Sequence, residues 1–392
     1  MGHHVKNLLL VLLAAASLAA CSPARGLEAW RLLDDLAAGG GPSALKQATP
    51  EPARTRIAYR VADRERVGDL YRPGETARAA LVLVPGAAPE GKDDPRLVAV
   101  AQALARVRFL VLVPEIPNLR DLKVRPEDAD AVADALRHLA ARPEAWGEAR
   151  GKTLGLVAIS YAAGPAVMAA LEPDLRGRVG FLAAVGGYYD IEALVRFFTT
   201  GYYRTRPDLT WKRVTPNPYG KWIFLRSNAE RVSSPRDRVL LIAMAQRKLD
   251  NLSAPLDDLI ARLGPEGRAV HALLVNTDPE AVPGLIAGLP STVRRDMAAL
   301  DLKTRDLTAL EAEVLLIHGR DDTVIPFTES KALAAALAPG RARLTIVDNL
   351  AHVDLGPTDL PDSLRLWRAA YRVLSLRDRG LGVPRAEREA GQ

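Results

Sequence analysis

Ser160 stands between two apolar segments in a position that suits a nucleophile. Residues 153–159 read TLGLVAI, which predicts a buried strand, and residues 164–171 read GPAVMAAL, which predicts a helix. A serine at a sharp strand-to-helix turn is exposed for attack, and the turn requires small residues two positions before and after it. Ala158 and Ala162 meet this requirement, although the usual pattern has glycine at both positions. The alternative interpretation is a serine that ends a strand and caps the next helix.

A nucleophilic serine needs a base, and the base needs an acid that orients it. Two acids, Asp321 and Asp322, follow the predicted strand at residues 314–317. A histidine, His352, follows the predicted strand at residues 342–347 in a loop. All of these side chains lie just past the ends of strands. The sequence therefore predicts that they meet Ser160 at one edge of a sheet.

The elements that must position these residues alternate regularly from residue 79 onward. Continuous apolar runs predict strands, and the segments between them predict helices at 95–106, 126–141 and 164–171. The predicted strands are 79–84, 109–113, 153–159, 181–185, 314–317 and 344–347. Strands that are apolar throughout and alternate with helices indicate a parallel sheet covered on both faces. Residues 55–61 and 66–72 alternate in polarity and predict a preceding hairpin.

These motifs and their order resemble the α/β-hydrolase fold. Residues 314–326, VLLIHGRDDTVIP, resemble its acid motif H-G-x-x-D-x-x-x-P, which implies Asp322 as the acid in preference to Asp321. Residues 69–73, DLYRP, resemble the strand before the oxyanion loop in the esterase and dienelactone-hydrolase-like branches. The resemblance implies a mostly parallel central sheet flanked by helices, with a helical cap insertion. It also implies a catalytic triad of Ser160, Asp322 and His352, with His318 in a structural role.

An oxyanion hole in this fold needs two backbone N–H donors. One is expected from Tyr161, the residue after the nucleophile, and the other from the loop that follows residues 79–84. Relatives often have His-Gly-Gly or a similar sequence there, whereas this chain has Pro85-Gly86-Ala87. We expect Ala87 to be the second donor, with Gly86 as the alternative.

The chain divides into a signal segment, a hydrolase-like core and an insertion. Half of the aromatic residues, ten of twenty, lie at residues 188–224, and these side chains are expected either to line an acyl pocket or to form the insertion's own core. Helices are expected there at 236–263 and 280–300. The predicted divisions are a signal peptide (1–20), an N-terminal helix and tether (21–54), the core (55–186 and 306–375), a helical cap (187–305) and a flexible tail (376–392).

The N-terminus has the features of a targeting segment. Lys6 precedes an apolar run at residues 8–16, which is shorter than the ~20 residues of a membrane span and fits a signal peptide. Leu18-Ala19-Ala20-Cys21 then resembles a bacterial lipobox, which implies an acylated Cys21 as the mature N-terminus. The alternatives are an ordinary signal peptide or a buried thiol. Ser22 in place of aspartate favours the outer membrane, so we expect a lipid-anchored protein of the bacterial envelope that faces the periplasm.

Composition excludes several classes of protein. The chain has 392 residues, 48% of them hydrophobic and 26% charged, which is typical of a globular protein. Its single cysteine excludes an intramolecular disulfide. The net charge of +6 comes from scattered residues with no basic stripe among stacking aromatics, which argues against nucleic-acid binding. No metal-binding, Gly-rich phosphate-binding or other cofactor motif is found, so no metal or cofactor is expected.

The motifs together favour a lipid-anchored serine hydrolase. The expected substrate is a small-molecule or lipid-like acyl ester, and the expected activity is that of a carboxylesterase. A lactone, an amide or peptide, or acyl transfer is an alternative, because the fold does not determine the substrate. A second alternative is an envelope lipoprotein that uses the fold as a non-catalytic binding module.

Overall fold

The centre of the molecule is an eight-stranded, mostly parallel sheet with the order β1-β2-β4-β3-β5-β6-β9-β10. A computed structural model describes residues 22–141, 154–205, 210–352, 354–356 and 359–379. The strands are β1 (Ala53–Val61), β2 (Arg64–Arg72), β3 (Ala79–Val84), β4 (Phe109–Pro114), β5 (Leu154–Ile159), β6 (Val179–Val185), β9 (Glu313–Gly319) and β10 (Ala342–Val347). The hairpin β1–β2 joins the sheet antiparallel to β4, and the other pairings are parallel. The predicted fold class is confirmed.

Helices cover both faces of the sheet. Every residue of β3 and β4 is buried, as expected for strands that have neighbours on both sides. One group of helices packs together on one side and contacts β4 and β10: α2 (Pro23–Ala38), α4 (Pro95–Arg106) and α16 (Leu360–Arg379). A second group contacts β3, β5 and β6: α6 (Asp128–Ala140) and α7 (Ala163–Ala170). A further helix, α15 (Thr328–Ala336), packs against β9 and β10.

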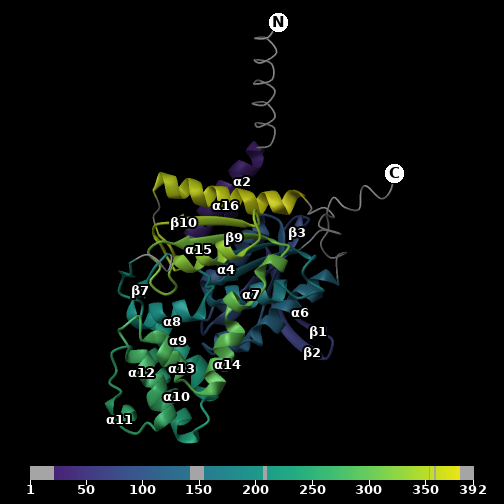
Figure 1. Cartoon of the computed structure of the whole chain (residues 1–392). Coiled ribbons are helices and arrows are strands. Elements are labelled where there is room, and N and C mark those ends of the chain that lie inside the picture. Colours follow the sequence, from purple (N-terminus) through teal and green to yellow (C-terminus); the bar gives the residue numbers. More distant parts are fainter. Residues whose placement is uncertain (1–21, 142–153, 206–209, 353, 357–358, 380–392) are drawn as a thin grey trace.

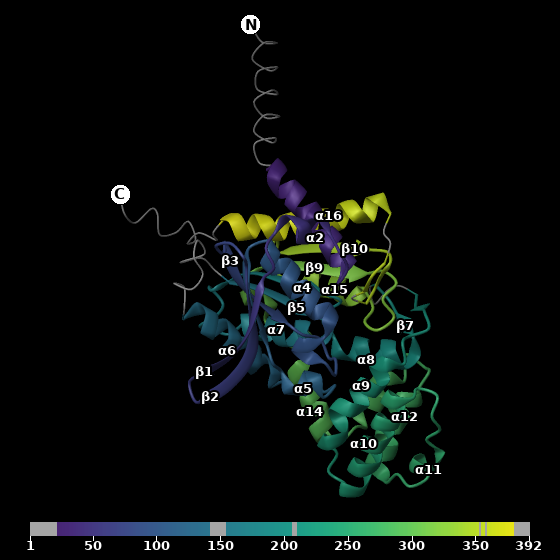
Figure 2. The same ribbon diagram turned by 180° about the vertical axis from the view of Figure 1, so that it is seen from behind.

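A long helical segment connects β6 to β9. We call residues 186–312 the β6–β9 segment, and Figures 1 and 2 show its helices at the end of the molecule opposite α2 and α16. Its longer elements are α8 (Ile191–Thr200), α9 (Tyr219–Asn228), α10 (Pro235–Asp250), α11 (Asp257–Ile260), α12 (Pro265–Val275), α13 (Val282–Ala287) and α14 (Ser291–Leu300). Two short strands, β7 (Tyr202–Tyr203) and β8 (Lys212–Arg213), pair with each other.

Two predicted helices of this segment are each divided in the structure. The prediction of one helix over 236–263 is wrong, because α10 ends at Asp250 and α11 begins at Asp257. The prediction over 280–300 is also wrong, because α13 ends at Ala287 and α14 begins at Ser291. The interruptions contain Pro255 and Pro290, and proline disfavours a helical conformation in the residue before it.

The chain ends differ in detail from the sequence prediction. Helix α3 (Ala44–Ala48) lies within the predicted tether, and α16 continues to Arg379, past the predicted start of the tail at 376. Residues 1–21, with the lipobox and Cys21, and residues 380–392 lie outside the described residues. Within the described ranges, no helix is both long enough and apolar enough to cross a bilayer.

Candidate active site

Ser160 lies at a strained turn between a central strand and a helix. Strand β5 ends at Ile159, the single-turn helix η3 (Ser160–Ala162) follows, and α7 begins at Ala163. The backbone of Ser160 has φ of +57°, in the left-handed region that costs a non-glycine residue roughly 1–2 kcal/mol. Strain of this kind persists only where the surrounding structure imposes it. The backbone geometry agrees with the sharp turn predicted from the sequence.

The structure brings the three predicted triad residues together. His352 Nε2 lies 2.7 Å from Ser160 Oγ, and His352 Nδ1 lies 2.9 Å from Asp322 Oδ2. With the proton on Nδ1, the imidazole donates to Asp322 and accepts from the Ser160 hydroxyl. The neighbouring Asp321 is exposed to solvent, so Asp322 is the acid in contact with the histidine. His352 also has a left-handed backbone, with φ of +58°.

The Asp322 carboxylate is buried, with an exposed fraction of 4%, and is held by several donors. Its Oδ1 accepts the backbone N–H groups of Val324 at 2.8 Å and Ile325 at 3.0 Å. Burial alone would raise the pKa of Asp322, but hydrogen bonds from His318 and His352 outweigh burial and hold this pKa well below its usual range. The acid is therefore ionised at neutral pH, which suits a group that stabilises a histidine cation.

His318 lies in the interior beside the acid, and its structural role stays a prediction. The imidazole is fully buried, with Nδ1 2.7 Å from Ser330 Oγ and Nε2 2.9 Å from the Ile325 carbonyl oxygen. Its Nε2 also lies 3.3 Å from Asp322 Oδ2. His318 therefore connects the acid loop to the first turns of α15 and has no contact with Ser160 among the described hydrogen bonds.

Gly186 is a site residue that the sequence analysis missed. It has φ of +64°, and a Cβ atom there would lie 3.4 Å from His352 Nδ1 and 3.5 Å from Asp322 Oδ2. Both separations are ordinary van der Waals contacts, so a Cβ would fit beside the acid and the base, but the positive φ would strain any residue other than glycine here. The sequence signal was the pair Gly186-Gly187 directly after β6, since paired glycines mark a close approach or an unusual turn.

The loop after β3 lies beside the serine, as the oxyanion prediction requires. A Cβ atom on Gly86 would lie 3.5 Å from Ser160 Cβ, so the loop backbone passes close to the nucleophile. No loop or turn hydrogen bond among the described residues uses the amide N–H of Gly86, Ala87 or Tyr161. These three predicted donors all border one cleft with Ser160 and His352. The choice between Ala87 and Gly86 as second donor stays a prediction.

The cleft has a volume of about 460 Å³ and a mixed lining. Glu90, Asp94 and Arg96 border it on the side of the oxyanion loop. Asn217 and Tyr219 border it from the β6–β9 segment. Glu90, Asp94, Arg96 and Asn217 were not predicted, because no motif surrounds them, whereas Tyr219 belongs to the aromatic cluster that was expected to line a pocket or to form the insertion's core.

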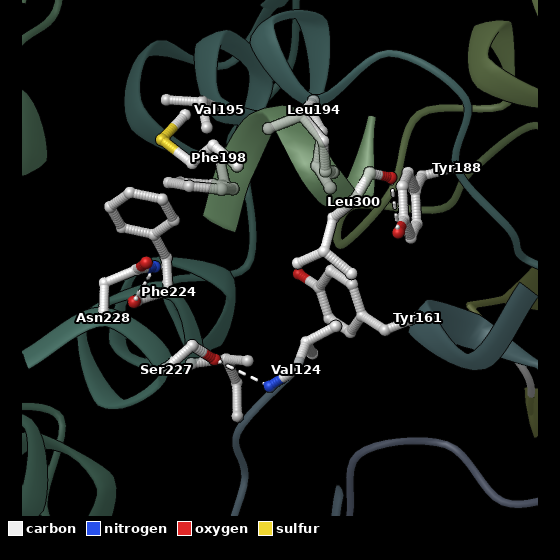
Figure 3. A pocket seen from close by; sticks show the side chains of 13 residues that line it. Val124, Tyr161, Tyr188, Leu194, Val195, Phe198, Phe224, Ser227, Asn228 and Leu300 are labelled. Carbon is white, nitrogen blue, oxygen red and sulfur yellow. Dashed lines mark hydrogen bonds between the residues drawn. The ribbon is translucent and has the colours of Figure 1, made fainter. Parts of the chain in front are cut away.

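A separate apolar pocket lies behind Tyr161. The Tyr161 side chain lines both the cleft and this pocket, whose volume is about 50 Å³. Figure 3 shows the phenol group directed into the pocket, across from Phe198 and Leu300 of the β6–β9 segment. The pocket wall is fixed by hydrogen bonds, one from Tyr188 Oη to the Leu300 carbonyl at 3.1 Å. The aromatic cluster noted in the sequence thus partly lines a cavity and partly packs within the segment.

Among the residues that the structure describes, no group of three or more His, Cys, Asp or Glu side chains could hold a metal ion.

The chain matches no family model and no curated protein.

Comparison with solved structures identifies the fold. A candidate hydrolase from Legionella pneumophila matches with a TM-score of 0.51 and 11% identity, over 86% of this chain and 91% of that chain. The rice cell wall degrading esterase LipA from Xanthomonas oryzae matches with a TM-score of 0.51 and 14% identity, over 86% of this chain and 94% of that chain. The chain therefore has the α/β-hydrolase fold, as its motifs predicted.

Proposed function

We propose that the protein is a serine hydrolase that cleaves acyl esters through an acyl-enzyme intermediate. The observation that carries the proposal is the continuous hydrogen-bond chain from Ser160 through His352 to Asp322. This chain begins at a strained turn and borders an open cleft. The esterase LipA shares the fold, which makes an ester the first class of substrate to test for the present chain.

The geometry supports a two-step reaction. Ser160 Oγ attacks the acyl carbonyl carbon while His352 Nε2 takes the hydroxyl proton, and the same proton then passes to the leaving alcohol. Asp322 holds the proton on Nδ1 and stabilises the histidine cation that forms. The amides of Tyr161 and of Ala87 or Gly86 would stabilise the negative oxygen of the tetrahedral intermediate. Water, activated by His352, then attacks the acyl-enzyme and releases Ser160.

The β6–β9 segment is proposed to act as a cap over the site. Asn217 and Tyr219 of this segment line the cleft, and the Asn217 N–H donates to the Thr323 carbonyl at 2.8 Å, next to the acid. The acyl group is proposed to bind in the cleft, and a short acyl chain is favoured because Tyr161 separates the cleft from the apolar pocket behind it.

The decisive test is a panel of p-nitrophenyl esters of increasing acyl length, together with lactone and anilide substrates. Wild type is expected to hydrolyse the short esters and to be labelled by a fluorophosphonate probe, whereas Ser160→Ala should lose both activities, with kcat lower by roughly 10⁴-fold or more. Preference for the lactone or the anilide would replace the ester assignment. Folded wild-type protein that is neither active nor labelled would contradict the proposal and favour a binding module.

Lipid anchoring at Cys21 in the bacterial envelope is a second, separate proposal. It is supported by the lipobox-like sequence and by the position of Cys21 directly before Ser22, whose side chain caps α2. Expression in a Gram-negative host with an alkyne fatty acid should label the wild-type chain and leave Cys21→Ser unlabelled. Equal labelling of both chains would contradict this proposal.

A further inference from the structure

Large apolar side chains are exposed on the surface formed by α2, α16 and the edge of β10. Leu27 and Trp30 of α2 are 53% and 42% exposed, and Leu360 and Leu364 of α16 are 70% and 38% exposed. Leu344 of β10 is 39% exposed. These five are most of the eight exposed large hydrophobic residues in the described part of the chain. We call this surface the α2–α16 face.

Aromatic contacts and hydrogen bonds hold α2 against α16 within the α2–α16 face. The rings of Trp30 and Trp367 are 6.4 Å apart, and those of Trp367 and Tyr371 are 5.4 Å apart. Trp367 Nε1 donates to the Gly26 carbonyl at 2.9 Å, and the Ser22 N–H donates to Tyr371 Oη at 2.9 Å. The first turn of α2 is therefore bound to α16. Tryptophan and tyrosine are the side chains enriched at membrane–water interfaces.

The same face is rich in arginine. Helix α16 contains five arginines and two aspartates, and of these arginines Arg377 is fully buried and paired with Glu28 and Asp378. A groove of about 640 Å³ between α16 and β10 is bordered by Arg343, Arg365, Arg368 and Arg372. Arg368 is exposed and forms no ion pair with another described residue, whereas the other three each pair with a carboxylate. This charge is complementary to anionic lipid headgroups.

Helix α2, which carries Leu27 and Trp30 of this face, begins directly after the predicted targeting segment. Residues 1–21 include the apolar run at 8–16 and Cys21, and they join the described structure at Ser22. Both views of the molecule show α2 and α16 at one end and the β6–β9 segment at the other (Figures 1 and 2). A membrane-bound N-terminus would therefore hold the α2–α16 face within a few residues of the lipid.

We propose that the α2–α16 face lies on an anionic lipid bilayer. Leu27, Trp30, Leu360 and Leu364 enter the boundary between headgroups and acyl chains, and Arg368 contacts lipid phosphate. Amphipathic surfaces bind in this way through apolar burial combined with electrostatic attraction. In this orientation the β6–β9 segment points away from the bilayer, so substrate reaches the cleft from the aqueous side.

The proposal is tested with the full-length chain carrying Cys21→Ser and a single introduced cysteine. Leu364→Cys places a nitrobenzoxadiazole fluorophore on the α2–α16 face, and Val275→Cys places it on α12 as a matched control at another exposed apolar position. Vesicles of equimolar phosphatidylcholine and phosphatidylglycerol are added, and emission is followed with and without nitroxide-labelled lipid.

We expect emission from position 364 to shift to the blue and to be quenched by the nitroxide lipid, while position 275 does neither. Adding Arg368→Glu should raise the half-saturating lipid concentration for the 364 signal on the order of tenfold. Three results would overturn the proposal. Position 364 could give no response, or positions 364 and 275 could respond equally. The emission from position 364 could also shift without lipid as the protein concentration is raised. The last result would identify a second copy of the chain as the partner. An unchanged half-saturating concentration with Arg368→Glu would overturn the electrostatic part.

Discussion

Substitution of Asp322 by asparagine is expected to reverse the proton arrangement of the active site. In the native site, Oδ1 accepts two backbone N–H groups, from Val324 at 2.8 Å and from Ile325 at 3.0 Å. Two donors need an acceptor, so the asparagine carbonyl oxygen must take the Oδ1 position. The NH₂ group then faces His352 Nδ1, where a donor has replaced the original acceptor.

This orientation forces the wrong tautomer of His352. With the asparagine NH₂ donating to Nδ1, the histidine carries its proton on Nε2, and Nε2 can no longer accept the proton of Ser160 Oγ. Loss of the correct tautomer in a serine–histidine–aspartate site lowers kcat by about 10⁴-fold. That factor corresponds to about 5.4 kcal/mol in the activation free energy. The geometry of the fold should be unaffected, because the side chain keeps its size and its backbone contacts.

Steady-state hydrolysis of a short p-nitrophenyl ester and the rate of fluorophosphonate labelling both report on this step. Asp321→Asn is the matched control, since Asp321 is adjacent in sequence and exposed, and it should retain wild-type rates. Far-ultraviolet circular dichroism checks that both variants fold. Activity of the Asp322→Asn enzyme within tenfold of wild type would refute the tautomer argument, and so would a loss of activity in Asp321→Asn that equals it.

Three further predictions concern the pocket, a buried acid and a close contact. Tyr161→Ala should join the apolar pocket to the cleft and raise kcat/KM for long acyl esters relative to short ones, whereas Tyr161→Phe should leave that ratio unchanged. Burial raises the pKa of Glu329 from 4.5 to about 7, so the folded protein loses stability as pH rises through that range. Glu329→Gln should remove this loss, raising the free energy of unfolding in urea by up to roughly 3 kcal/mol above pH 7. Below pH 4.5 the substitution should change this free energy little. Equal effects at both pH values would contradict the raised pKa of Glu329. Gly164→Ala should cost about 1–3 kcal/mol in the same assay, because its Cβ would collide with Tyr188 Oη; a neutral result would show that Tyr188 can move.

The strands were predictable because the central sheet is buried on both faces. Strand β3 has the predicted bounds, Ala79–Val84. Its six apolar residues lie between a polar turn and Pro85, and a run this short and apolar is typical of a buried strand. Helix α4 also has the predicted bounds, Pro95–Arg106. The Asp94 side chain caps it by accepting the Arg96 N–H at 2.8 Å, and proline occupies its first position. Such local signals do not depend on the rest of the fold.

The divided helices and the lining of the site were harder to predict, because tertiary contacts decide them. Apolar periodicity continues across residues 236–263, but the chain turns between Asn251 and Leu256 so that α10 and α12 can pack together. Gly186 could be recognised only once His352 and Asp322 were placed beside it. In contrast, the juxtaposition of Ser160, Asp322 and His352 was predictable, since each follows a strand whose end lies at the same edge of the sheet, and their catalytic roles stay a proposal.

The three residues of the proposed triad depend on different parts of the fold for their positions. Ser160 follows β5, which pairs with β3 and β6 in the middle of the sheet, so the strained turn is supported on both sides. Asp322 and His352 follow β9 and β10, and β10 is the last strand of the sheet. Their alignment therefore relies on contacts outside the sheet: the His318 hydrogen bonds, the close approach of Gly186, and the Asn217 N–H that donates to the residue after Asp322. The contacts of Gly186 and Asn217 both belong to the β6–β9 segment, and the same segment packs against Tyr161 beside the nucleophile through Tyr188. A movement of the proposed cap would therefore disturb both the acid–base pair and the turn that holds Ser160.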